Sequence, residues 1–518
     1  MSKTISTQSQ PLTKSLVKRI IPIAEWLLLA VGVAIALAPI YSVSWYQTGD
    51  GPFHLYSATV LNDILFHSGE SFGRFYDLHI TPVPNTSVLV FQSLMLELFN
   101  PNTVLMLTIL VISGGLILGY FYFIKSINPD QKGISVLILP MAISFFTIIG
   151  FFSFLASLAL MLVTLGYFNK RAHNLNKKHI AVLAAFITLN WFTHFTGALF
   201  SLGYIALYIL LINKEEKTSM IKMFLLICIP FVSLSLVFGK EASKSSAVDF
   251  TPFSNLFKAL LDFSPLVCYH SDEINYIRHF QYLLLLLFPI SIFYFRKREL
   301  KPTLFAPLIF SLLLVTIFFI VPSNFLNLKS INFRILFCAL LFFCAFIEAY
   351  SPRYYLVLTI PVVIFVLLKK KNFQTPIVEA YSERIESIVK NTEALPKGKA
   401  VIAMNYSDNW LEYNICLYPA ATHRIVILDN EEAATFNSII RWKKNKQPGP
   451  NIGNVFTSNN PILKLNYEKD ADEKIEGVVQ WQYNIPGIDS VAIHNDSIFT
   501  NLFIDKGKKN GVQVYIRK

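Results

Sequence analysis

An acidic residue and a histidine stand four positions apart just beyond the first long apolar stretch of the chain. Asp50 and His54 belong to the string Gly49-Asp50-Gly51-Pro52-Phe53-His54. A carboxylate at the end of an apolar stretch can take a proton from a hydroxyl group or ligate a divalent metal. The Gly-Pro pair after Asp50 favours the start of a helix. Asp50 can therefore instead be the cap of that helix, and His54 can be a packing residue.

Basic and imidazole groups near the ends of other apolar stretches form a second set of candidates. Arg334 begins one such stretch, with Lys329 shortly before it, and the planar guanidinium group is suited to binding a phosphate. His194 lies between two apolar stretches, where an ionisable residue marks a candidate site. His270 belongs to a polar segment rich in acids and aromatics. The alternatives are an arginine that extends to lipid headgroups and a histidine hydrogen-bonded inside a bundle.

The composition indicates which elements must position these residues. Of the 518 residues, 53% are hydrophobic and 15% are charged, whereas about 25% are charged in a soluble domain. Apolar runs of the roughly 20 residues that cross a bilayer recur from residue 20 to 368. This pattern predicts a polytopic α-helical membrane protein. The net charge of +12 lies largely in short loops, so it indicates topology rather than nucleic-acid binding. The five cysteines show no metal-binding spacing and are expected to be apolar fillers.

Charge asymmetry predicts the orientation of the spans. Residues 1–19 carry basic residues and no acidic ones, which places this tail in the cytoplasm. We expect about 11 spans, at 20–43, 103–124, 134–149, 152–168, 180–196, 197–212, 221–238, 280–295, 302–321, 333–349 and 353–368. Outer loops then cover 44–102 and 239–279. Residues 88–98 are apolar but short and are expected to lie on the outer interface. The cluster Lys369, Lys370 and Lys371 falls outside, against the positive-inside rule.

The chain beyond Lys371 has the composition of a soluble domain. Short apolar stretches predict strands at 399–404, 424–428, 477–481 and 512–516. Helices are predicted at 377–389 and 430–444. The expected organisation is a cytoplasmic tail (1–19), a membrane domain (20–371) and an outer α/β domain (372–518). A parallel sheet is one arrangement that the predicted strands of the outer domain can form.

This organisation resembles that of the GT-C glycosyltransferases, integral membrane enzymes that use polyprenyl-phosphate-linked sugars. The strings Gly49-Asp50-Gly51-Pro52-Phe53-His54-Leu55, Pro84-Asn85, Gly150-Phe151-Phe152-Ser153-Phe154 and Asn430-Glu431-Glu432-Ala433 look similar to segments of uncharacterised bacterial members. The resemblance covers most of the chain in architecture and only short strings in sequence. It implies that Asp50 is the catalytic or metal-organising carboxylate and that Arg334 holds the lipid phosphate. The acidic pair that follows the first span in some members is missing, so dependence on Mg²⁺ or Mn²⁺ stays open.

The resemblance implies transfer of a sugar from a polyprenyl-phosphate donor to a glycan, lipid or protein acceptor. The expected location is a bacterial inner membrane, with the C-terminal domain in the periplasm and membrane lipids as further partners. Two alternatives stand beside this function: a multi-span transporter or lipid flippase, and a non-catalytic partner in envelope polysaccharide assembly. An enzyme should gather Asp50, His194 and Arg334 in one outer cavity, whereas a transporter should have a path through the bundle.

Overall fold

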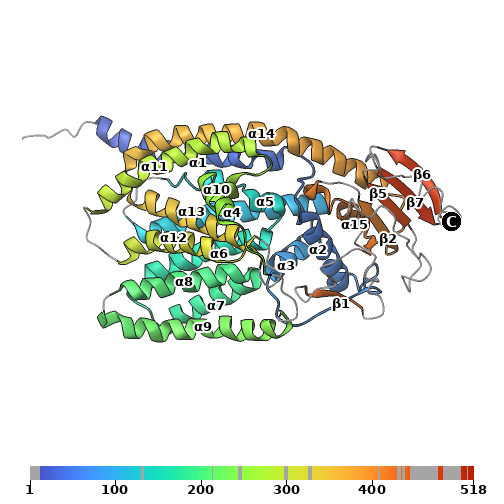
Figure 1. Cartoon of the computed structure of the whole chain (residues 1–518), viewed down its shortest axis with the longest axis horizontal. Helices are drawn as coiled ribbons and strands as arrows, with labels where there is room; N and C mark the ends of the chain where they lie inside the picture. The colour runs from blue at the N-terminus through green and yellow to red at the C-terminus, as the bar shows by residue number, and fades with distance from the viewer. Residues whose placement is uncertain are drawn as a thin grey trace, which may run out of the picture.

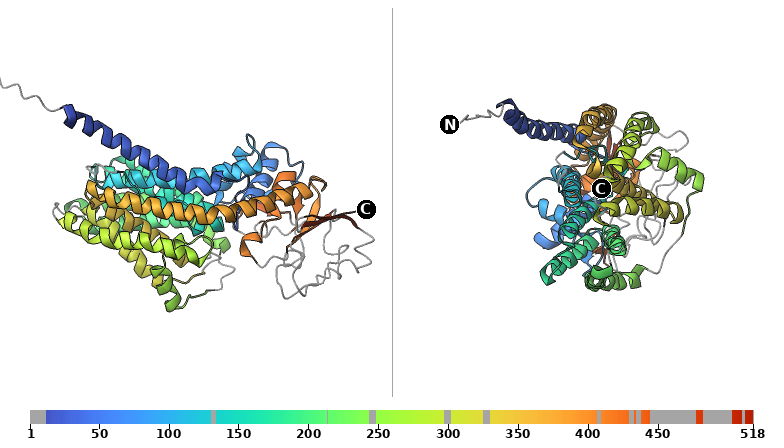
Figure 2. Two further views of the ribbon diagram at one scale, coloured as in Figure 1. Left: turned by 90° about the horizontal axis from the view of Figure 1, so that it is seen from above. Right: turned by 90° about the vertical axis from the view of Figure 1, so that its left-hand side faces the viewer.

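Long helices lie side by side in a bundle, and short helices and a small sheet gather at one end of it (Figure 1 and Figure 2). The computed structural model describes residues 12–129, 134–212, 214–242, 248–296, 302–324, 330–405, 409–428, 433, 438–443, 477–481, 503–509 and 512–517. The smaller region contains both the residues that follow α1 and the C-terminal strands. Segments far apart in the sequence therefore meet at this end of the bundle.

The bundle consists of helices at most of the predicted spans. These are α1 (Leu12–Tyr41), α4 (Pro101–Ile127), α6 (Phe152–Arg171), α7 (Lys177–Thr193), α8 (Phe195–Leu211), α9 (Lys214–Ala242), α11 (Ile274–Arg296), α12 (Pro302–Ile320), α13 (Ile331–Tyr350) and α14 (Leu356–Asn391). Among the described residues, six helices are long and apolar enough to cross a bilayer by length and composition. This result supports a multi-pass membrane protein, and the number of 11 spans stays a prediction.

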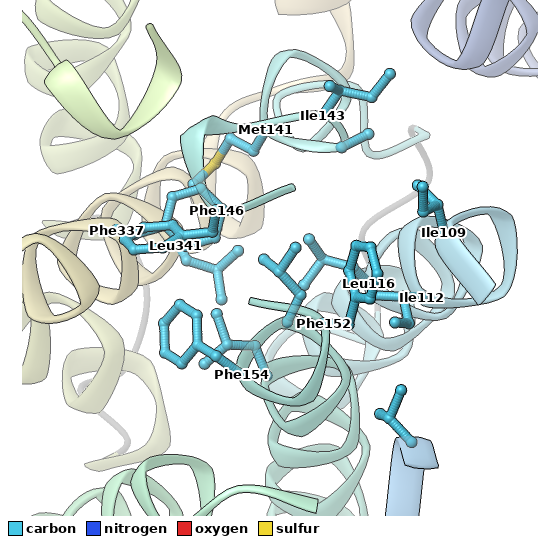
Figure 3. Close-up of a cluster of buried hydrophobic side chains, with 14 of the residues drawn as sticks. Ile109, Ile112, Leu116, Met141, Ile143, Phe146, Phe152, Phe154, Phe337 and Leu341 are labelled. Atoms are coloured by element: carbon cyan, nitrogen blue, oxygen red, sulfur yellow. The ribbon is translucent and has the colours of Figure 1, made fainter. Parts of the chain in front are cut away.

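The predicted span at 134–149 is not a continuous helix. It starts without regular structure, forms a single 3-10 turn, η1 (Leu139–Met141), and ends in the short helix α5 (Phe145–Ile149). Figure 3 shows its apolar side chains packed against those of α4, α6 and α13. Irregular backbone is tolerated at membrane depth only where protein surrounds it, and this segment is buried along most of its length.

Two buried charged side chains pair with the backbone of this broken segment. Glu348 accepts hydrogen bonds from the N–H groups of Val136 and Leu137, at 2.6 and 3.0 Å. Lys370 donates to the carbonyl groups of Pro140, at 3.2 Å, and Ile143. Buried backbone groups need such partners, so Glu348 and Lys370 replace the hydrogen bonds that a regular helix would supply.

One of the three lysines that opposed the positive-inside rule has a structural role. Lys370 is only 5% exposed and lies inside α14, which continues for 36 residues through the predicted domain boundary at 371/372. The predicted helix at 377–389 is the second half of α14. Lys370 therefore reports an internal contact and carries no information about which side of the membrane it faces.

Short elements lie in the chain between α1 and α4 and between α9 and α11. They are α2 (Gly51–Phe66), β1 (Tyr76–Leu78), α3 (Thr86–Met95), α10 (Phe253–Leu261), η2 (Ser264–Leu266) and η3 (Ser271–Glu273). The helix α3 covers much of the apolar stretch 88–98 and packs against α2. Its ten residues span about 15 Å, which is too short to cross the roughly 30 Å of hydrocarbon.

The C-terminal region contains a mixed sheet rather than a parallel one. Its order is β3 (Val426–Ile427), β2 (Ala400–Asn405), β5 (Gly477–Trp481), β7 (Val512–Arg517) and β6 (Phe503–Lys509). Only β3, β2 and β5 run parallel, whereas β7 is antiparallel to both of its neighbours. The four predicted strands are confirmed, and β6 was not predicted.

The predicted helix at 430–444 is wrong where the structure describes it. Ile440–Trp442 is a strand, β4, that pairs with β1 of the segment between α1 and α4. Ile440 and Trp442 are buried and Arg441 between them is half-buried, which is the alternation of a strand. Of the string 430–433, the structure describes only Ala433.

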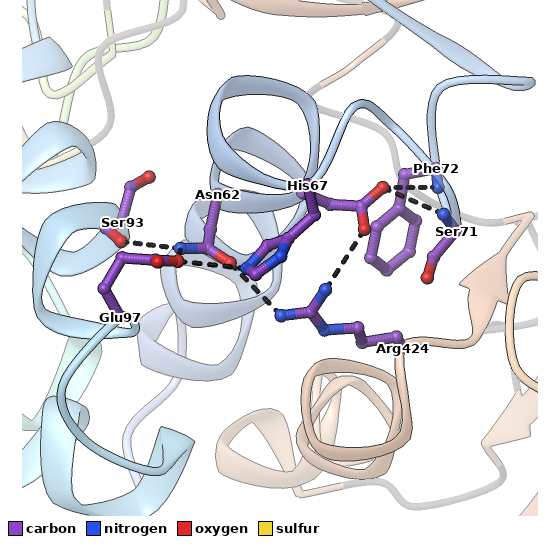
Figure 4. Close-up of polar contacts among 8 residues, drawn as sticks. Asn62, His67, Ser71, Phe72, Ser93, Glu97 and Arg424 are labelled. Atoms are coloured by element: carbon purple, nitrogen blue, oxygen red, sulfur yellow. Dashed lines mark hydrogen bonds and ion pairs between the residues drawn. The ribbon is translucent and has the colours of Figure 1, made fainter.

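A buried carboxylate also joins the segment between α1 and α4 to the C-terminal region (Figure 4). Asp63 in α2 accepts hydrogen bonds from the N–H groups of Ser71 and Phe72, at 3.0 and 2.9 Å. Arg424, directly after the helix α15 (Leu417–His423), pairs with Asp63 at 3.2 Å and donates to Asn62 at 3.3 Å. These contacts, with the β1–β4 pairing, fix α2 against the C-terminal region.

Candidate functional site

Two glycine-containing turns meet at the end of the bundle next to the C-terminal region. The backbone N–H groups of Gly49 and Asp50 donate to the carbonyl groups of Ile148 and Ile149, at 2.8 and 2.6 Å. The turns contain two of the strings singled out in the sequence, 49–55 and 150–154. The structure thus brings the loop after α1 against the junction between α5 and α6, and Asp50 lies at this contact.

The glycines of both turns allow this close approach. Gly150 has φ +90°, and a Cβ atom there would lie 2.6 Å from the backbone nitrogen of Gly51. A Cβ atom on Gly49 would lie 2.9 Å from the carbonyl oxygen of Ile149. Residues with side chains rarely adopt positive φ, so the backbone contact requires glycine at position 150 for both its conformation and its lack of side chain.

Asp50 does not cap α2 through its side chain. It occupies the N-cap position, but its carboxylate makes no capping hydrogen bond. Thr48 Oγ instead accepts the hydrogen bond from the N–H group of Gly51, at 3.0 Å. The capping alternative is therefore confirmed for the position of Asp50 but not for a hydrogen bond from its side chain. The carboxylate of Asp50 interacts electrostatically with the guanidinium group of Arg334, which begins a different helix almost three hundred positions later.

Arg334 points into the protein from the first turn of α13. It is 6% exposed, so it does not extend to lipid headgroups as the snorkelling alternative required. Its guanidinium carbon lies 4.4 Å from the centre of the Phe151 ring and 5.4 Å from that of Phe154. Nη1 lies 2.8 Å from His194 Nε2. Nε is buried and has no hydrogen-bond partner among the described residues, so a donor is left for a ligand.

His194 separates α7 from α8 and contacts two hydrogen-bond donors. Its Nδ1 accepts from the N–H group of Thr196 at 3.1 Å, and its Nε2 faces the N–H group of Arg334. A neutral imidazole carries a proton on one nitrogen and accepts only at the other. One of the two contacts is therefore unsatisfied. An oxygen atom that accepted from both Arg334 and an Nε2–H group would satisfy every donor.

Four helices begin beside these residues. The contacts of Asp50, Phe151, His194 and Arg334 place the N-termini of α2, α6, α8 and α13 around one point. Each N-terminus carries a partial positive charge. Together with the unpaired Nε of Arg334, they form a positive environment suited to an anion, next to the single carboxylate of Asp50.

His54 lies against the second turn rather than beside Arg334. Its ring centre is 5.9 Å from that of Phe152, and it interacts with the backbone of Gly150. Burial lowers the pKa of His54 to about 4, so the side chain is neutral at pH 7. The structure therefore places His54 as a support of the turn that contacts Asp50.

Two predicted binding residues are not brought to this cluster by any described contact. His270 is exposed, and its Nδ1 pairs with Asp272 of the same turn at 3.1 Å. Lys329 lies outside the described residues. The cluster thus contains Asp50, His194 and Arg334, with His54 behind it.

Residues of the C-terminal region complete the surroundings of Asp50, and the sequence did not indicate them. The side chain of Asn414 donates to the carbonyl group of Gly49 at 2.9 Å. The ring of Trp410 lies 3.2 Å from where a Cβ atom of Gly49 would stand. Both residues are about 360 positions from Gly49, and no local pattern in the C-terminal region could have shown that they approach it.

The residues around Asp50 do not fit a divalent metal. Among the described residues, no group of three or more His, Cys, Asp or Glu side chains could hold one. The charged neighbour of Asp50 is the cationic Arg334, which would repel a dication. Mg²⁺ and Mn²⁺ prefer several oxygen ligands, and no reaction step is derived through a metal.

Comparisons with known proteins give distant similarities to solved structures. No family model matches the chain, and no curated protein matches it. Solved structures that match include the crystal structure of ArnT from Cupriavidus metallidurans bound to undecaprenyl phosphate. The similarity covers 94% of this chain and 97% of that chain, with 11% sequence identity and a TM-score of 0.47. These values are too low to assign a function, which must be argued from the site itself.

Proposed function

We propose that this protein transfers a sugar from a polyprenyl-phosphate donor to an acceptor hydroxyl group at the outer end of the bundle. One observation carries the proposal. The buried guanidinium group of Arg334 has an Nε donor without a partner among the described residues, shares its Nη1 with His194 and interacts with the carboxylate of Asp50. A cation with an unused donor is suited to bind a phosphate, and a carboxylate beside it is suited to accept a proton.

The phosphate of the donor would bind between Arg334 and His194. Nη1 of Arg334 would donate to one of its oxygens, and Nε would supply a further charged donor on the opposite edge of the guanidinium group. His194 would keep its Nδ1 bond from Thr196 and donate from Nε2 to the same phosphate. The N-termini of α6, α8 and α13 would add to the positive field.

Asp50 would act as the general base. It takes the proton of the acceptor hydroxyl group while the acceptor oxygen forms a bond to the anomeric carbon of the sugar. The bond between that carbon and the phosphate oxygen breaks, and polyprenyl phosphate leaves with the electron pair. Arg334 stabilises the charge that develops on the leaving phosphate. A displacement in one step would invert the anomeric centre.

His54 would serve as a positioning residue. Its neutral ring packs on Phe152 and interacts with Gly150, whose turn holds the backbone of Asp50 through the neighbouring Ile149 carbonyl group. A histidine that is neutral at pH 7 and faces the backbone is poorly suited to donate protons in the reaction.

The other buried charges favour an enzyme over a transporter or flippase. Ionisable groups in the core of a transporter line the path of the transported ion or substrate. Here Glu348 and Lys370 hold the backbone of the broken segment 134–149 instead. A non-catalytic partner in polysaccharide assembly would not need an unpaired guanidinium donor beside a carboxylate.

The test is transfer of radiolabelled sugar by the purified protein from a panel of polyprenyl-phosphate sugars, with membrane extract as the source of acceptors. We expect transfer by the wild type and loss of transfer in Asp50→Asn, with both proteins eluting alike in detergent. If neither protein transferred any sugar of the panel, while reconstituted vesicles moved labelled lipid across the bilayer, the protein would be a flippase.

A further inference from the structure

An exposed tryptophan of the C-terminal region stands beside the Asp50 turn. Trp410 begins the 3-10 turn η5 (Trp410–Glu412) and is 40% exposed. Its ring lies 3.2 Å from where a Cβ atom of Gly49, the residue before Asp50, would stand. An exposed indole forgoes hydrophobic stabilisation that a ligand can recover by covering it.

The turn that carries Trp410 is held firmly in place. Asn409 accepts the N–H group of Leu411 at 3.1 Å, which caps the turn. Gln47, from the loop before Asp50, donates to the carbonyl group of Leu411. Asn414 donates to the carbonyl group of Gly49 at 2.9 Å. The indole is therefore exposed but preorganised, so little conformational entropy is lost when a ligand packs on it.

Trp410 belongs to a row of aromatic rings that leads to Arg334. Its ring centre is 6.4 Å from that of Phe145, and Phe145 is 6.3 Å from Phe333, the residue before Arg334. Phe145 and Phe333 are half-buried. The row thus runs along the site from the Asp50 turn to the start of α13, on the side of the C-terminal region.

We propose that Trp410 is the platform on which the sugar ring of the donor stacks. This inference rests on the proposed function and names how the sugar is recognised. With the donor phosphate at Arg334 and the anomeric carbon near Asp50, the sugar ring lies along the aromatic row. The apolar C–H face of a sugar packs well on an indole face. Trp410 would then distinguish a glycosylated donor from the bare polyprenyl phosphate that leaves.

The test measures binding, so it does not depend on turnover. Calorimetry in detergent would compare two probes, a short-chain isoprenyl phosphate that carries a sugar and the same isoprenyl phosphate without it. In Trp410→Leu we expect the affinity for the glycosylated probe to fall about tenfold and the affinity for the bare probe to stay unchanged. Trp410→Phe, which keeps an aromatic face, should retain most of the affinity. Tyr413→Leu removes another exposed aromatic residue of this region and serves as the control.

Two results would overturn the proposal. Equal losses for both probes would show that Trp410 contacts the isoprenyl chain or the surrounding lipid, in the manner of interfacial tryptophans. Unchanged affinity for both probes would show that Trp410 contacts neither the sugar nor the isoprenyl chain. The test also separates this inference from the proposed transfer reaction. If Trp410 contributed to sugar-dependent binding but the protein transferred no sugar, this inference would stand and the proposed reaction would fail.

Discussion

Arg334 is the residue on which the anion site depends. Replacing it with Met removes the donors at Nε and Nη1 and leaves Asp50 and His194 without their cation. Truncating one partner of a buried charge pair costs about 2 kcal/mol or more, so affinity for short-chain isoprenyl phosphate should fall about 30-fold or more. Calorimetry measures this loss. Arg334→Lys keeps the charge without the planar fork and should bind with intermediate affinity, whereas wild-type affinity in Arg334→Met would contradict the site.

The histidine behind the Gly150 turn predicts a pH dependence of stability. Burial lowers the pKa of His54 to about 4 in the folded protein, against about 6.5 in the unfolded chain. Its contribution to stability is complete above pH 6.5 and is lost as the pH falls from 6.5 to 4, because the unfolded state then binds the extra proton.

Thermal unfolding in detergent between pH 8 and pH 4 tests this dependence. The Tm of the wild type should fall more steeply below pH 6.5 than the Tm of His54→Phe, which has no ionisable ring. Parallel curves for the two proteins would mean that His54 is already solvated and titrates freely.

At the scale of elements, the contact between the Asp50 turn and the Gly150 turn predicts that Gly150 does not tolerate a side chain. Gly150→Ala introduces a Cβ at φ +90°, within 2.6 Å of the Gly51 nitrogen. Strain of this kind costs about 1–3 kcal/mol, and the contact adds to it. We expect a lower Tm and loss of isoprenyl phosphate binding, because α5 and the Asp50 turn must separate.

Gly114 in α4 provides the matched control. A Cβ there would meet nothing within 4 Å, so Gly114→Ala should leave both Tm and binding at or above the wild-type values. If the two alanine variants behaved alike, the packing of the turns would not determine the site.

The broken segment between η1 and α5 depends on a buried ammonium group. Lys370→Met leaves the carbonyl groups of Pro140, Ile143 and Leu266 without their donor, and an unsatisfied buried group costs about 1–3 kcal/mol. We expect a clearly lowered Tm. Lys369→Met, one position away and exposed, should have little effect, and equal effects of both substitutions would contradict the role given to Lys370.

These elements show what the sequence could and could not predict. Runs of apolar residues located the helices of the bundle, because length and hydropathy suffice for a span. The break in 134–149 has no such signal, since its partners Glu348 and Lys370 are more than 200 positions away. The strand at 440–442 was missed for the same reason: its partner β1 belongs to the first outer loop.

The candidate site was likewise predictable in part from the sequence. Asp50, His194 and Arg334 were singled out because charged or imidazole groups at the ends of apolar stretches are conspicuous, and the enzyme hypothesis expected them to lie together. Their mutual contacts, and the approach of Trp410 to Gly49, arise only when distant segments pack together. The Gly-Pro pair predicted the helix start after Asp50, and in the structure His54 of that helix interacts with the backbone of Gly150.

For the whole molecule, the predicted orientation places the N-terminus in the cytoplasm and the C-terminal region in the periplasm. Single cysteines at two exposed positions test it: Asn174→Cys, between α6 and α7, and Glu393→Cys, after α14. An impermeant maleimide applied to spheroplasts should label only Glu393→Cys. The native cysteines interfere little, since four are buried and Cys228 is half-buried. Labelling of Asn174→Cys alone would reverse the orientation and place the candidate site in the cytoplasm.

The central claim is that Asp50 takes the acceptor proton while other groups bind the donor. The most direct test measures both properties in Asp50→Asn, which keeps the shape of the side chain and removes its charge. We predict that the variant binds glycosylated isoprenyl phosphate at least as tightly as the wild type, because Arg334 no longer interacts with a carboxylate. Its rate of sugar transfer in a single turnover should fall at least about 100-fold. Transfer by Asp50→Asn at the wild-type rate, with donor bound, would contradict the account.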